Sequence, residues 1–284
     1  MVTSLIDWLS QIPTWAVAGL MLAAALGGGF VGRSLRLRSD RRGATGSGFA
    51  SDGQEGYIVS GVLGLLALMM GFSLAMAVDR FDSRRGLVLE EAKAISTTYL
   101  RSQLLDEPHR ARLSKLLVEY TDNRIVLATA KRDDVPKLLA DNDRMLTDFW
   151  AATAAAFDSI ADLDFSSSFL ESASSVVEND VARKAARLAR VPRAVFVLLS
   201  LYVVVTAGVL GYVLSGFRGR LAGGFLITLL TIALALIIDL DRPTSGSIRE
   251  SQAPMELLRA SLKAQPPEVF DRYRSVELPS ENRP

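Results

Sequence analysis

Four stretches of the chain are apolar without interruption over enough residues to cross a lipid bilayer. They run from Thr14 to Gly32, Tyr57 to Val78, Ala194 to Ser215 and Leu221 to Ile238, and none contains Asp, Glu, Lys, Arg or His. A hydrocarbon core of about 30 Å needs about 20 apolar residues in a helix. Because backbone polar groups in lipid must bond within their own segment, we expect four transmembrane helices.

The apolar stretches pair into two hairpins. No Lys or Arg precedes Arg33, so the first stretch lacks the basic start of a secretory signal, and we interpret it as a retained span. Only Gly216–Arg220 separates the last two stretches, which predicts a tight turn and an antiparallel pair. The many glycines of the spans are compatible with close helix packing and equally with the ordinary glycine content of membrane helices.

A polar segment of helical character separates the hairpins. Apolar residues recur there at spacings of three and four, in four stripes. The fourth stripe is expected to comprise Phe169, Leu170, Ala173, Val176, Val177 and Val181. Helix breaks are expected at residues 106–108, 133–136 and 166–168. No breaker follows Val78, so the second membrane helix is expected to continue to about Leu105.

These patterns predict an all-α, polytopic membrane protein with four transmembrane helices and a helical soluble domain inserted between helices 2 and 3. The expected divisions are an N-terminal membrane hairpin over 1–78, a soluble domain over 79–192, a C-terminal hairpin over 193–239 and a tail over 240–284 that packs on the soluble domain.

Composition excludes several kinds of chemistry. The 284 residues include 32 basic and 31 acidic side chains, so the formal charge of +1 offers no basic field for nucleic acid. There is no cysteine, and the single histidine, His109, lies in a charged stretch. We therefore expect no enzyme, no catalytic residue, no metal site and no cofactor.

Basic residues near the span ends indicate on which side of the membrane the soluble domain lies. An even number of spans puts both termini and the soluble domain on one side, which carries more basic residues than the other. The positive-inside rule thus favours a cytoplasmic domain and cytoplasmic termini in a bacterial inner membrane. The arginines directly after the first span favour the opposite orientation: Arg33, Arg36, Arg38, Arg41 and Arg42.

Two segments resemble a known family. Residues 68–81 contain Gly71-Phe72 followed by Arg80-Phe81, a spacing similar to that of the second transmembrane helix of bestrophins. Glu91-Ala92 follows, and residues 239–248 resemble the stretch after the last bestrophin span, with an Asp-x-x-x-Pro-x-x-Gly pattern. The sequence is most similar to the bacterial bestrophin-like domain family.

The resemblance implies a homo-oligomer, a pentamer in bestrophins, with a central ion pathway lined by the second helix. The implied neck residues are Phe72, Leu68 and Gly64, and because Gly64 is not bulky the upper ring is open or is formed by Leu65. The implied pore-exit or inter-subunit residues are Asp79, Arg80, Glu90, Glu91, Pro243 and Gly246. The acidic run that binds calcium in bestrophins is lacking, so calcium gating is not expected.

Each of these positions also has a simpler interpretation. Leu68 and Phe72 could pack against neighbouring helices, Arg80 could extend to the membrane interface, and the two glutamates could belong to a solvated face. An alternative function is a non-conducting, membrane-anchored sensor or scaffold whose helical domain binds a cytoplasmic partner. The predicted partners are the lipid bilayer, further copies of the chain and inorganic ions.

Overall fold

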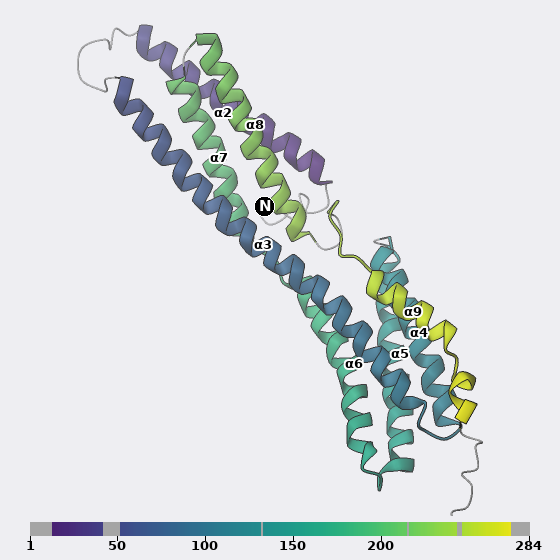
Figure 1. Cartoon of the computed structure of the whole chain (residues 1–284). Helices are drawn as coiled ribbons and strands as arrows, with labels where there is room; N and C mark the ends of the chain where they lie inside the picture. Colours follow the sequence, from purple (N-terminus) through teal and green to yellow (C-terminus); the bar gives the residue numbers. More distant parts are fainter. Residues whose placement is uncertain (1–12, 42–51, 132, 215, 243–245, 274–284) are drawn as a thin grey trace, which may run out of the picture. The chain divides into compact units, whose positions relative to one another are not determined.

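The structure is a computed structural model that describes residues 13–41, 52–131, 133–214, 216–242 and 246–273. All regular elements among these residues are helical (Figure 1), which confirms the expected all-α class. The α-helices are α2 (Thr14–Arg41), α3 (Asp52–Ser102), α4 (His109–Thr129), α5 (Val135–Ile160), α6 (Phe165–Leu188), α7 (Arg193–Val213), α8 (Gly216–Asp241) and α9 (Ala253–Ala264). A 3-10 helix, η1 (Pro267–Tyr273), follows α9.

The chain divides into two compact units. The first, here called the membrane unit, comprises residues 1–82 and 189–249, and the second, the bundle unit, comprises residues 83–188 and 250–284. Helix α3 contributes residues to both units and is continuous over 51 residues. The prediction that the helix of the second span continues past Val78 is therefore confirmed, with its end at Ser102 rather than Leu105.

The membrane unit contains α2, α7, α8 and the first part of α3. Among the described residues, four helices are long and apolar enough to cross a membrane, and they correspond to the four predicted stretches. Three of them extend further than predicted: α2 continues beyond Gly32 to Arg41, α3 begins at Asp52, and α8 runs from Gly216 to Asp241. Polar and charged residues can continue a helix after the apolar stretch has ended, so apolarity alone does not locate the helix end.

Glycines bring α2 and α7 into very close contact. A Cβ atom built on Gly32 would lie 1.9 Å from the carbonyl oxygen of Gly208, and one built on Gly211 would lie 2.0 Å from that of Gly29. Only glycine permits such an approach of two helix backbones. By contrast, a Cβ on Gly64 of α3 would meet nothing within 4 Å, so the glycines of the spans do not all serve packing.

The connection between α7 and α8 is shorter than predicted. Helix α7 ends at Val213 and α8 begins at Gly216, so residues 217–220 form the first turn of α8 instead of a loop. Gly216, the first residue of α8, has a φ of +71°, a conformation that favours glycine. The Nε of Arg220 donates a hydrogen bond to the carbonyl oxygen of Gly216 at 3.0 Å.

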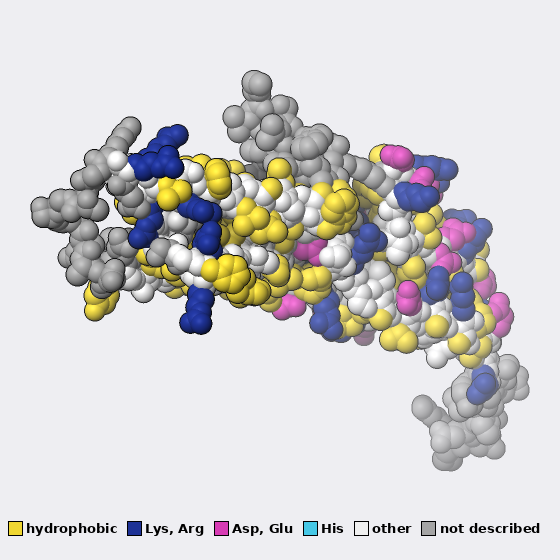
Figure 2. All heavy atoms as spheres, turned by 90° about the horizontal axis from the view of Figure 1, so that it is seen from above, with side chains coloured by type: hydrophobic (Ala, Val, Ile, Leu, Met, Phe, Trp, Pro, Cys, Tyr) yellow, Lys and Arg dark blue, Asp and Glu magenta, His cyan; other side chains and the backbone are white. Residues whose placement is uncertain are grey.

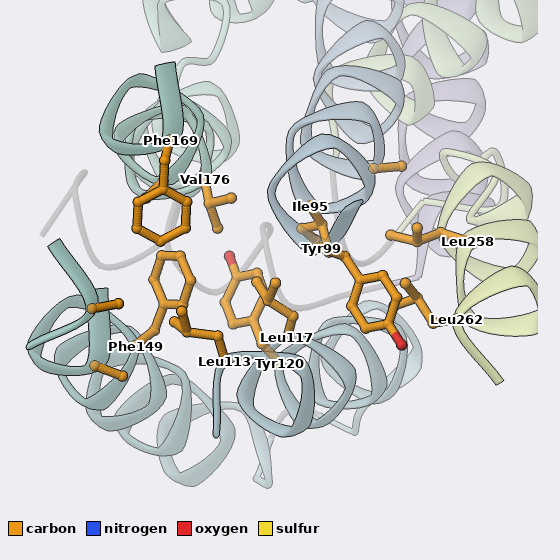
Figure 3. Close-up of a cluster of buried hydrophobic side chains, with 14 of the residues drawn as sticks. Ile95, Tyr99, Leu113, Leu117, Tyr120, Phe149, Phe169, Val176, Leu258 and Leu262 are labelled. Atoms are coloured by element: carbon orange, nitrogen blue, oxygen red, sulfur yellow. The ribbon is translucent and has the colours of Figure 1, made fainter. Parts of the chain in front are cut away.

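The bundle unit surrounds one hydrophobic core, drawn in Figure 3. Its buried side chains come from the second part of α3 and from α4, α5, α6 and α9, and include Ile95, Leu113, Leu117, Phe149 and Phe169. The helices begin close to the predicted breaks, at residues 109, 135 and 165.

The fourth predicted stripe is only partly correct. Phe169, Ala173 and Val176 are buried, but Val181 is exposed, and the positions of α6 that continue the buried stripe are Asp180 and Arg183. The inward face of α6 thus changes from apolar to charged along its length.

The C-terminal segment packs on the bundle. Helix α9 buries Met255, Leu258 and Leu262 in the core, and Figure 3 shows the two leucines beside Tyr99 of α3. The hydroxyl of Tyr99 donates a hydrogen bond to the carbonyl oxygen of Gln265 at 2.8 Å. In η1, Asp271 forms an ion pair with Arg110 of α4. Apolar contacts, a hydrogen bond and an ion pair together fix the segment.

Candidate functional site

Helix α3 presents two different faces within the membrane unit. Leu66, Met70, Ser73 and Ala77 are buried, and they recur at spacings of four, three and four residues. Leu66, Met70 and Ala77 belong to the same apolar cluster as Leu199 of α7. This spacing defines a single face of an α-helix, so one side of α3 packs within its own chain.

The predicted neck residues lie on the other side of α3. The side chains of Leu65, Leu68 and Phe72 are 48%, 56% and 64% exposed, and Gly64 faces open space. At about 100° per residue, Leu68 is about 200° around the helix from the buried Leu66. The apolar side chains of this face are thus not used for packing within a single chain.

The next predicted residues along α3 are Asp79 and Arg80. Asp79 is exposed and Arg80 is partly buried. Among the residues that the structure describes, neither makes an ion pair within the chain. Their charges therefore have no partner in the membrane unit itself and are left to water, to lipid headgroups or to another copy of the chain.

Adjacent glutamates of α3 have opposite environments. The carboxylate of Glu90 is exposed and pairs with Lys93 at 2.7 Å, one turn further along the helix. The side chain of Glu91 has no exposed surface. The sequence motif predicts a position at the pore exit or between subunits for both glutamates. The structure separates them, and Glu91 belongs to the interior of the bundle.

Glu91 is the centre of a buried charge network. Its carboxylate accepts a hydrogen bond from the hydroxyl of Tyr120 at 2.6 Å and forms ion pairs with Arg124 and Arg183, the former at 2.9 Å. Burial, and next the charge of Glu91, raise the pKa of Tyr120 well above its ordinary value. Tyr120 therefore remains a neutral hydrogen-bond donor, and the glutamate faces two arginines.

A second carboxylate extends the network to α5. Asp180 of α6 accepts hydrogen bonds from Arg124 at 3.1 Å and from the side-chain amide of Asn142 at 3.0 Å. Lys184 pairs with Asp180 at 2.6 Å and also with Asp143. Buried charges are stable only when they are paired and hydrogen-bonded, and this network meets that condition for both carboxylates.

The residues after the last span form a compact turn. The carboxylate of Asp239 accepts hydrogen bonds from the hydroxyl of Thr14 at 2.6 Å, from the backbone and hydroxyl of Ser247, and from the backbone N–H of Ile248 at 3.0 Å. Gly246 is buried, and a Cβ there would lie 2.6 Å from the carbonyl oxygen of Asp239. Pro243, the other predicted residue of this turn, lies outside the described residues.

The membrane unit shows an apolar side-chain belt in the space-filling view of Figure 2, with arginines gathered at one end. Four apolar helices and a bundle of charged helices define a polytopic, integral membrane protein. The bestrophin-like domain family matches residues 22–255, so the chain belongs to that family. The resemblance inferred from the sequence motifs is thereby confirmed.

Solved structures support the same fold. Crystal structures of two single-residue variants of a bacterial bestrophin homologue from Klebsiella pneumoniae are similar to this chain at 15% identity each, with TM-scores of 0.67 and 0.62. The similarity covers 88% and 86% of this chain and 97% of each homologue. A search of curated proteins found no match.

Proposed function

We propose that the chain forms a homo-oligomeric, bestrophin-like ion channel whose pore is lined by α3. The observation that carries this proposal is the exposed apolar face of α3, with Leu65, Leu68 and Phe72 directed away from the packing of their own chain. Family membership and the bestrophin homologue fold support the same function.

An oligomer would place these side chains around a common axis. Rings of large apolar side chains can close a pore to ions by excluding water. Phe72 and Leu68 would form two such rings, and the third would be open at Gly64 or formed by Leu65. By the family resemblance we propose a pentamer.

Charged residues further along α3 would surround the same pathway. Glu90 is exposed and could attract cations as a ring of carboxylates. Asp79 and Arg80 would lie near the membrane boundary and could pair between subunits. Gly246 lies in the turn after α8, which we assign, together with Pro243, to the pore exit or to a subunit contact.

The proposed location is a bacterial cytoplasmic membrane, with the bundle unit and both termini in the cytoplasm. The count of basic residues near the span ends supports this orientation.

Ion flux through purified protein in liposomes tests the proposal. Phe72→Ala should raise the flux, because the smaller side chain leaves the ring wider and easier to wet. Phe225→Ala is a matched control, since Phe225 lies on α8 and is also 64% exposed. Equal effects of the two substitutions on flux would contradict the assignment of Phe72 to the pore.

A scaffold is the alternative function. A purified oligomer without an axial path, together with absent flux for both the wild type and Phe72→Ala, would favour it. In that case α3 would serve only to connect a membrane anchor to the bundle.

A further inference from the structure

A small pocket lies beside the charge network in the bundle unit. Its charged lining consists of Arg84 of α3, Arg183 and Arg187 of α6, and Glu250, which precedes α9. The remaining lining comes from Leu87, Val88 and Ala186. Three guanidinium groups thus share one pocket with one carboxylate.

Two of the three arginines already have acidic partners. Arg84 pairs with Glu250, and Arg183 pairs with Glu91. Both arginine side chains are at most 5% exposed. Arg187 differs: in the described part of the chain, no carboxylate lies within ion-pair distance of its guanidinium and no hydrogen bond from it is found.

Most of the charged groups around the pocket have ion-pair partners. Glu91 is shared by Arg124 and Arg183, Asp180 by Arg124 and Lys184, and Lys184 also contacts Asp143. Together with Arg84, Glu250 and the unpaired Arg187, five basic groups face four carboxylates. Among the described residues, Arg187 is the basic group of this set that has no ion pair.

Arg187 is also partly buried. Burial, followed by the charges of Arg183 and Arg124, lowers the pKa of Arg187 to about 10. The guanidinium nevertheless stays protonated at neutral pH. The charges of Glu250 and Glu91 oppose this shift but do not reverse it, and a partly desolvated cation is stabilised when an anion reaches it.

We propose that the pocket binds a small monovalent anion, of the size of chloride, held by Arg187 with Arg84 and Arg183. The free space admits little more than one water-sized group. Ligand pockets for drug-sized molecules are about 300 Å³ or larger, so a nucleotide or a lipid headgroup is excluded by size. A single negative charge would give Arg187 the counter-ion that the described residues do not supply.

Thermal unfolding of the full chain in detergent tests this site. The midpoint should be higher in sodium chloride than in sodium gluconate at the same ionic strength, because gluconate is too large for the pocket. Chloride at ten times its dissociation constant should raise the midpoint by about 3 °C. Arg187→Gln should abolish this difference, and Arg112→Gln, at an exposed arginine of α4, should preserve it.

Equal midpoints of the wild type in the two salts would overturn the proposal, as would a chloride effect that persists in Arg187→Gln. Bromide soaked into crystals of the wild type gives a second readout that does not depend on the variant folding. An anomalous peak beside Arg187 is expected. No peak there, combined with loss of the oligomer in Arg187→Gln, would instead assign Arg187 to a carboxylate of a neighbouring subunit.

Discussion

The charge network predicts that Glu91→Gln lowers the stability of the bundle unit. The substitution keeps the shape of the side chain but removes the negative charge that Arg124 and Arg183 share. The amide can still accept a hydrogen bond from one donor, but it cannot neutralise two buried guanidinium groups. Among the described residues, Asp180 then remains the only carboxylate that pairs with Arg124.

The expected cost follows from burial. Removing one partner of a buried ion pair destabilises proteins by about 3–5 kcal/mol, because the other charge is left without compensation. In a chain of this size, each kcal/mol lowers the midpoint of thermal unfolding by about 2–4 °C. We therefore expect Glu91→Gln to lower the midpoint of the bundle unit by at least about 6 °C.

The neighbouring glutamate supplies the control. The side chain of Glu90 is 56% exposed and pairs only with Lys93, so Glu90→Gln should change the free energy of unfolding by less than about 1 kcal/mol. Unfolding can be followed by circular dichroism and by the fluorescence of Trp150, the one tryptophan in the sequence of the bundle unit. Equal midpoints for the two variants would refute the role assigned to Glu91.

Two further pairs of substitutions test packing, both by the midpoint of thermal unfolding in detergent. Gly32→Ala places a methyl group against the backbone of Gly208 and should destabilise the membrane unit by about 1–3 kcal/mol. A Cβ atom built on Gly27 meets nothing within 4 Å, so Gly27→Ala should be neutral or slightly stabilising. A larger loss of stability in Gly27→Ala than in Gly32→Ala would contradict the close contact of α2 and α7. Leu258 is 6% exposed, and Leu258→Ala should lower the free energy of unfolding by about 2–5 kcal/mol. Leu257 is 72% exposed, and Leu257→Ala should lower it by less than about 0.5 kcal/mol. Similar losses for both leucines would show that α9 does not dock as described.

The spans could be predicted because backbone polar groups in lipid must form hydrogen bonds within their own segment. A stretch such as Ala194–Val213 must be a helix, whatever its neighbours are. The start of α8 could not be predicted as well, because it depends on the positive φ of Gly216, a backbone conformation that apolarity does not reveal. Gly32 and Gly64 are equally small in the sequence, and only the position of a second backbone distinguishes them.

The charge network was missed although its register is visible in the sequence. Arg124 follows Leu113, Leu117 and Tyr120 at helical spacing, so it occupies a core position of its stripe. Glu91 likewise follows Val88 on α3. A charged residue at a core position indicates a buried ion pair only if another stripe offers the opposite charge, and which stripes meet is a tertiary property.

The same register separates the roles of the two glutamates on α3. Glu90 lies about 200° around α3 from the buried Val88, on the exposed edge of the helix. Glu91 is rotated by about 100° from that edge and returns to the face of Val88 and the core. A carboxylate ring in the proposed channel would therefore be formed by Glu90 and not by Glu91. Glu90 and Glu91 are adjacent in the sequence, yet Glu90 is a candidate pore-lining residue and Glu91 is the centre of a buried network.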